Sequence, residues 1–285
     1  MNATANPLSM YMRQPKIYIR LPSEGQYWPE GSIAPTETGE FPVYSMTAKD
    51  ELVLKVPDAL MNGQAIVDVI QHCIPNIKNA WHVPSIDLDV VLIAIRLATY
   101  GEMMTVPVTF GETLELEYQV DLRVVMDQLL NQISWDPVVS ISDDLTVFVK
   151  PVDYKNITKS AIQSFETQRI IQMVNNDQLS EDKKVKLFQE SFKKISDATL
   201  GSISGSISKI ESSNGSTDNI QHIQEFVDNI DKDMFNKIQE HLELLRDKNA
   251  IKPMQVAVTD EMKEKGVTGE TIEIPITFDP STFFV

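Results

Sequence analysis

The chain has 285 residues, a length that suggests one large domain or two modest ones. Its 42% hydrophobic and 23% charged residues lie in the globular range and provide enough apolar material for a sizeable core. The 41 acidic residues outnumber the 25 basic ones, which gives a formal charge of −16. This charge argues against a duplex nucleic-acid binder, which uses Lys and Arg to displace phosphate counterions, and it disfavours an anionic membrane surface on the same grounds.

The sequence also argues against disulfide bonds, a signal peptide and a membrane span. The single cysteine, Cys73, excludes an internal disulfide framework and a multi-thiolate zinc site. The N-terminal stretch MNATANPLSMYMRQPK lacks the basic start and apolar core of a signal peptide. The longest uninterrupted apolar run, Val90 to Ile95, is far shorter than the ~20 residues of a membrane span. We therefore expect a soluble chain in a reducing cytoplasm.

The composition changes along the chain and predicts an α+β fold. All 3 tryptophans and most prolines lie before residue 150, whereas residues 156–250 are nearly free of proline and rich in Lys, Gln, Glu, Asn and Asp. We expect a mixed core domain over residues 1–155, with small antiparallel strands and a buried helix. A helical arm would follow over residues 156–250, and residues 251–285 would carry a strand that returns to the first domain.

The first elements in chain order are short. Residues 16–45 are punctuated by Pro and Gly, which predicts turns, and Tyr18–Leu21 fits a strand. Thr47 can cap a helix whose positive end favours Asp50, and Pro57 ends that helix. A second helix is expected around Gln64–Cys73, stopped by a proline two residues later.

The most apolar helix is predicted over Ile86–Tyr100, ended by Gly101. Because apolar residues cover most of its circumference, it is either the centre of a core or docked in a partner, and we favour the core. The segments Val106–Phe110 and Thr113–Tyr118 are typical of a β-hairpin. A helix from Asp121 to about Gln132 follows, and then another strand, Leu145–Val149.

The arm is predicted from a mirror pattern between Val185 and Leu245. Apolar residues spaced by three and four pair about Gly215, so that Ile203 faces Val227 and Ile207 faces Ile223. An antiparallel helical hairpin produces this pattern, with its turn near residues 212–217. A second helix pair is the open alternative. Because two helices bury little core, we expect the arm to contact a partner or a second copy of the chain, through Ile203, Ile207, Ile223 and Val227.

The end of the chain alternates like a strand over Thr271–Phe278. Beyond it, Phe283 and Phe284 need an apolar pocket, either in the first domain or in a partner. We favour docking within the first domain and keep both phenylalanines as candidate partner-binding residues.

The sequence carries no recognisable catalytic or metal-binding pattern. The sequence has no Gly-rich phosphate loop, no HExxH and no pair of CxxC motifs, and we assign no catalytic residue, cofactor or metal ligand. His72 and Cys73 are adjacent and point about 100° apart on a helix, which favours a structural interpretation. Asp143 and Asp144 could bind a divalent cation in a metal-dependent enzyme but are more typical of a turn. Asp87 and Asp89 are interpreted as helix-capping residues.

Several segments together resemble the baseplate hub assembly proteins of contractile-tailed T-even-type bacteriophages. They are PVYSMTAKDE, PDALMNGQAIVDVIQHCIPNIKN, PSIDLDVVLIAIRLATYGEMMTVPVTF and the terminal Pro-Ile-Thr-Phe-Asp and Phe-Phe. The similarity covers about residues 15–135 and the end of the chain. Its most specific part is one helix and the hairpin that follows it. The helix has an Asp followed by apolar residues, then Ile95-Arg96, and it leads into Tyr100-Gly101-Glu102. The helical arm lies outside it.

The resemblance implies a protein–protein role in building the central baseplate hub, with hub proteins as partners. The chain would be an assembly factor, a chaperone for hub subunits or a minor hub component; a stoichiometric structural subunit of the virion is the alternative. It would act in the host cytoplasm during assembly or remain in the virion baseplate. Many relatives carry cysteines in the hairpin after the helix, but Val106–Tyr118 contains none, so a zinc site is not carried over.

Overall fold

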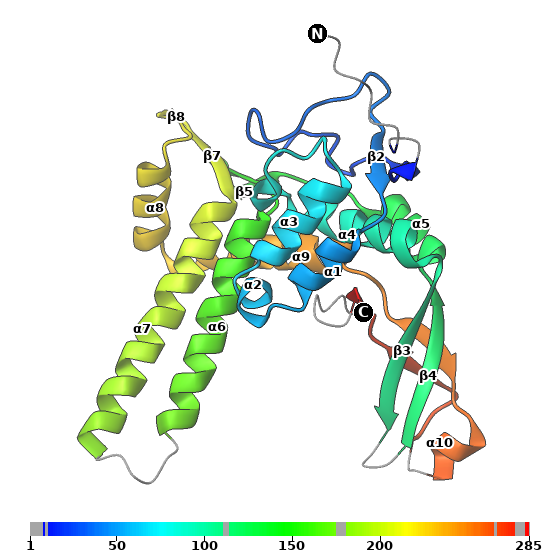
Figure 1. The fold of residues 1–285 in the computed structure, drawn as a ribbon. Helices are drawn as coiled ribbons and strands as arrows, with labels where there is room; N and C mark the ends of the chain where they lie inside the picture. Colours follow the sequence, from blue (N-terminus) through cyan, green and yellow to red (C-terminus); the bar gives the residue numbers. More distant parts are fainter. Residues whose placement is uncertain are drawn as a thin grey trace.

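The computed structural model describes residues 8, 11–110, 114–174, 181–264, 267–276 and 283–284. They form small antiparallel sheets and helices of up to 26 residues, so the predicted α+β class is confirmed (Figure 1). No helix within these ranges is long and apolar enough to cross a membrane.

The first half of the chain alternates short strands and helices. In order they are β1 (Pro15–Ile19), β2 (Phe41–Tyr44), α1 (Ala48–Leu54), α2 (Pro57–Met61), α3 (Gln64–Cys73), η2 (Ala80–His82), α4 (Ser85–Tyr100), β3 (Met103–Phe110), β4 (Leu114–Asp121), α5 (Leu122–Gln132), β5 (Val138–Ser142) and β6 (Leu145–Val149).

The second half begins with two long helices. It continues α6 (Tyr154–Val174), α7 (Glu181–Ser206), β7 (Ile207–Ser212), β8 (Gly215–Thr217), α8 (Ile220–Asn229), α9 (Lys232–Asn249), β9 (Met254–Ala257), α10 (Asp260–Glu264) and β10 (Thr271–Ile274).

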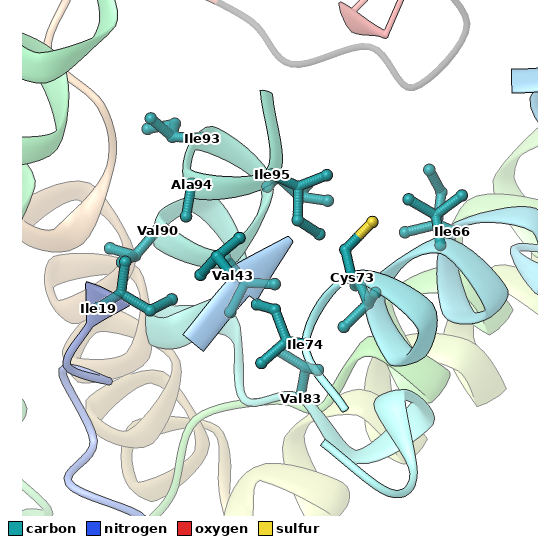
Figure 2. Close-up of a cluster of buried hydrophobic side chains, with 14 of the residues drawn as sticks. Ile19, Val43, Ile66, Cys73, Ile74, Val83, Val90, Ile93, Ala94 and Ile95 are labelled. Atoms are coloured by element: carbon teal, nitrogen blue, oxygen red, sulfur yellow. The ribbon is translucent and has the colours of Figure 1, made fainter. Parts of the chain in front are cut away.

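Helix α4 is the centre of the first core, as predicted. Its middle residues, Val90 to Ile95, are at most 5% exposed. Strands β1 and β2 and helix α3 pack around it. The side chains that meet there come from segments far apart in the sequence (Figure 2); among them are Ile19, Val43, Ile66, Cys73, Ile74, Val83, Val90, Ile93, Ala94 and Ile95.

Most predicted local elements of the first half are confirmed. Thr47 caps α1 in a reciprocal capping box with Asp50, because each side chain bonds the other residue's backbone N–H. Pro57 begins α2, consistent with proline's preference for a first helical position. The hairpin of β3 and β4 is antiparallel throughout, and Asp121 caps α5.

A second core lies around the sheet of order β5-β6-β7-β8, in which all neighbouring strands are antiparallel. Helices α7 and α8 pack on β7, and α9 packs on β5. Apolar residues from both sides of residue 155, among them Val147 and Ile207, share this core. The boundary expected at residue 155 therefore does not separate two cores, because β5 and β6 belong with the later helices.

The predicted helical hairpin with a turn at residues 212–217 is wrong. Residues 207–212 form β7, which pairs with β6, and Ser212 pairs with Gly215 across a two-residue turn. Asn-Gly at residues 214–215 is a strong β-turn signal, and the Gly/Ser run from Gly201 to Ser206 weakens the helix before it. The antiparallel long helices are instead α6 and α7, which pack together; residues 175–180, between them, lie outside the described residues.

The C-terminal strand is confirmed but has a different partner. β10 pairs with β9, with Ile274 opposite Met254, rather than joining a sheet of the first domain. The segment still returns to that domain, because Met254 and Ile276 contact its core. The predicted continuation of the strand at residues 277–278 lies outside the described residues.

Candidate protein-contact sites

The end of the chain docks on helix α4. Arg96 and Tyr100 lie one turn apart; the Arg96 guanidinium donates to the backbone oxygen of Phe283, and the Tyr100 hydroxyl donates to that of Phe284 over 2.8 Å. The two phenylalanine rings meet edge to face with centroids 5.0 Å apart, and Arg96 lies over the Phe283 ring. Both residues are at most 3% exposed. The interpretation as docking within the first domain is confirmed.

Asp87 connects α4 to the N-terminal loop. Its carboxylate accepts hydrogen bonds from the backbone N–H of Ser23 and the indole N–H of Trp28, each over 2.8 Å, and from the Ser23 hydroxyl. Burial raises the pKa of this carboxyl although all three hydrogen bonds lower it. The capping interpretation is wrong for Asp87, because Pro84 occupies the cap position and no side chain caps the helix.

Asp89 lines a groove between the start of α4 and the helices α6, α7 and α9. The groove has a volume of about 700 Å³, and its mixed lining includes Trp135, Thr167, Ile195 and Arg246. Burial in this groove raises the pKa of the Asp89 carboxyl to about 6. Asp89 is therefore a second position where an expected capping residue faces another part of the molecule.

His72 and Cys73 form no reactive pair. The Nδ1 atom of His72 lies 2.6 Å from a carboxylate oxygen of Asp50. Burial and the nearby Asp50 charge raise the pKa of the Cys73 thiol to about 12, so it stays protonated and is a poor nucleophile at neutral pH. The structural interpretation fits this geometry.

Asp143 and Asp144 occupy the exposed turn between β5 and β6. The Ser142 hydroxyl donates to Asp144 over 2.7 Å, and the Asp144 backbone oxygen accepts from Ser213. Over the residues that the structure covers, no group of three or more His, Cys, Asp or Glu side chains could hold a metal ion.

The four arm residues expected to contact a partner lie in the second core. Ile203, Ile207, Ile223 and Val227 are between 2% and 6% exposed. Helix α7 packs on α8, so Ile203 and Val227 do belong to facing elements, as the mirror pattern suggested. Their contacts here are internal to the chain.

A different set of apolar side chains on α7 is exposed. We call Val185, Phe188, Phe192 and Ile195 the α7 stripe; they are between 45% and 65% exposed, and Ile195 also lines the edge of the groove that contains Asp89. Pairing about Gly215 also places Phe192 opposite Ile238, Phe188 opposite Leu242 and Val185 opposite Leu245, but these three α9 residues pack in the second core. The spacing of three and four was thus a correct signal of an apolar helix face and an incorrect guide to its partner.

Comparison with known proteins identifies the family. The family described as T4 bacteriophage base plate protein matches residues 15–256. No curated protein and no solved structure matches the chain. The match runs through residues 156–250, so the helical region, expected to lie outside the resemblance, is part of the family pattern. The chain belongs to the T4 bacteriophage base plate protein family.

Proposed function

We propose that this chain is a non-enzymatic assembly factor of the baseplate hub that acts through contacts with other hub proteins. Its family supports a structural or assembly role in the phage baseplate. The hub is chosen within the baseplate because the segments around α3 and α4 resemble hub assembly proteins. The proposed place of action is the host cytoplasm during assembly.

The polar residues of the α4 motif support a structural role of this motif over a catalytic one. Asp87 bonds the N-terminal loop, Arg96 bonds the backbone of Phe283, and Tyr100 bonds the backbone of Phe284. A catalytic carboxylate or cation must be available to a substrate, whereas these groups are occupied by internal partners. The most specific part of the resemblance therefore supports a motif that organises the fold.

The distribution of apolar surface supports the contact role. The α7 stripe presents two phenylalanines that are 59% and 65% exposed. Contiguous exposed apolar side chains on a water-soluble protein mark interaction sites. The surplus of acidic residues would help to keep an aggregation-prone hub subunit in solution.

Quantitative mass spectrometry of purified phage particles tests the assembly-factor role. We expect peptides of this chain in infected-cell extracts and a signal far below one copy per hub in finished particles. The family description also suits a retained component. A stoichiometric signal in particles would overturn the transient factor in favour of a structural subunit of the virion.

A further inference from the structure

We propose that the α7 stripe pairs with the α7 stripe of a second copy of this chain, with the two helices antiparallel. Successive helix positions advance by about 100°, so the four stripe residues fall within a strip about 80° wide. Their spacing of three, four and three residues is the same in either chain direction. In the antiparallel arrangement Val185 lies opposite Ile195 of the second copy, and Phe188 lies opposite Phe192.

The stripe lies on the same face of α7 that packs against helix α8 further along the chain. Ile203 follows Val185 by 18 residues, which is about five full turns, so both point to the same side of α7. Ile203 is 6% exposed because it lies in the second core with Val227 of α8. Helix α8 has 10 residues and α7 has 26, so α8 covers only one end of this face, and the other end of α7 extends past it (Figure 1).

The exposed apolar area is in the range that a small dimer needs. Phe188 and Phe192 are 59% and 65% exposed, which at ~200 Å² per ring leaves about 250 Å² uncovered. Val185 and Ile195 are 53% and 45% exposed and add about 100 Å². Two copies would bury about 700 Å² of apolar surface, or about 1,200 Å² in total at the usual apolar share, which is the lower end of specific interfaces.

Repulsion between copies is weaker in this region than in the rest of the chain. Residues 154–206 hold 8 basic and 6 acidic residues, for a net charge of +2. The remaining chain holds 17 basic and 35 acidic residues, for a net charge of −18, so two such bodies repel each other. Antiparallel pairing through α7 keeps the two acidic bodies at opposite ends of the contact, whereas parallel pairing would place them side by side.

Light scattering coupled to size-exclusion chromatography tests the pairing on the full chain. We expect the wild-type mass to rise toward twice 32.1 kDa as the concentration increases through the micromolar range. Phe188→Asp with Phe192→Asp should stay at 32.1 kDa with an unchanged far-ultraviolet circular dichroism spectrum, because both side chains are exposed. The control Ile162→Asp with Phe165→Asp, on exposed positions of α6, should dimerise like the wild type.

The orientation is tested with single cysteines and a short bismaleimide cross-linker. In the antiparallel pair the two copies of Gln189 lie at nearly the same height, whereas the copies of Val185 lie about 15 Å apart along the axis; in a parallel pair the copies of Val185 would be neighbours. We expect Gln189→Cys to cross-link and Val185→Cys to cross-link at least tenfold less. The native Cys73 is buried with a pKa of about 12 and should not react.

A wild-type chain that stays monomeric through this concentration range overturns the inference. A dimer that survives the stripe substitutions, is lost in the α6 control, or cross-links mainly through Val185→Cys also overturns it. The inference goes beyond the hub proposal and can fail separately from it, since the test measures self-association in the purified chain and not the content of particles.

Discussion

At the scale of single residues, helix α4 shows how polar groups can fix distant segments around an apolar core. Asp87 bonds residues 59 and 64 positions earlier in the chain, and Arg96 bonds Phe283, 187 positions later. Both are buried, so an unsatisfied partner would be left in a low-dielectric interior if either were removed. The same helix therefore holds the N-terminal loop and the end of the chain.

Docking of the C-terminal phenylalanines should contribute measurably to stability. Phe284 is 3% exposed, so Phe284→Ala should lower the free energy of unfolding by about 3 kcal/mol through lost burial and the cavity that remains. The matched change Phe165→Ala, at a residue 52% exposed, should cost less than about 1 kcal/mol. Urea unfolding of the two variants provides the comparison, and equal losses would contradict internal docking.

The raised pKa of Asp89 predicts a pH-dependent effect of its removal. The folded chain binds a proton at Asp89 below about pH 6, whereas the unfolded chain binds it only below about pH 3.9. Stability present at low pH is therefore lost as the pH rises from 3.9 to 6. Asp89→Asn should raise the free energy of unfolding by about 1 to 3 kcal/mol at pH 7.5 and change it little at pH 4.

Urea titrations at both pH values measure that difference. Asp68→Asn, at an exposed position of α3, is a suitable control and should change the free energy of unfolding by less than about 0.5 kcal/mol. A gain of the same size at pH 4 and pH 7.5 would contradict the burial of the Asp89 carboxyl in the groove.

Residue roles were predictable from the sequence only where the partner is near in the chain. Thr47 and Asp50 form the expected cap because they are three residues apart. Asp87 occupies the first turn of a helix, which is typical of a capping residue, but its partners lie in a loop whose position depends on the complete core. No local sequence pattern indicates that Asp87 bonds this loop instead of capping α4.

At the scale of elements, the pairing of strands that are neighbours in the sequence was predictable, and the pairing of distant strands in the second core was not. The β3–β4 hairpin was predictable because both strands are adjacent in sequence. The pairing of β6 with β7 was not, because 57 residues and two long helices separate Val149 from Ile207. The Asn214-Gly215 signal for a β-turn was present, but the regular apolar spacing on either side of it suggested helices.

Substitution of Ile203 tests whether this residue belongs to the second core or to a surface that contacts a partner. Ile203→Asp would bury an unpaired charge in the second core and should lower the free energy of unfolding by on the order of 4 kcal/mol or more. Ile220→Asp, at a position 72% exposed, should change it by less than about 0.5 kcal/mol. Thermal unfolding monitored by circular dichroism would show the difference, and a folded, wild-type-like Ile203→Asp chain would place this residue outside the core.

At the scale of the whole molecule, the chain combines two small cores with a long helix pair. Helices α6 and α7 extend beyond the neighbouring elements (Figure 1), and this region carries a net charge of +2 in a chain of −16. The α+β class and the resemblance to baseplate proteins of T-even-type phages were recognisable in advance. Which helices form the projecting pair was not, because the pairing depends on a sheet assembled from distant strands.

The proposed assembly role is tested most directly in cells infected with a phage that cannot produce this chain. The measurement is the number of complete baseplates. Without the chain we expect few complete baseplates by electron microscopy. Supplying the wild-type chain, or the variant Asp143→Ala with Asp144→Ala, should restore them equally, because neither carboxylate is needed for protein contacts. Normal baseplate numbers in its absence, or failure of the double variant to restore them, would contradict a non-enzymatic assembly role.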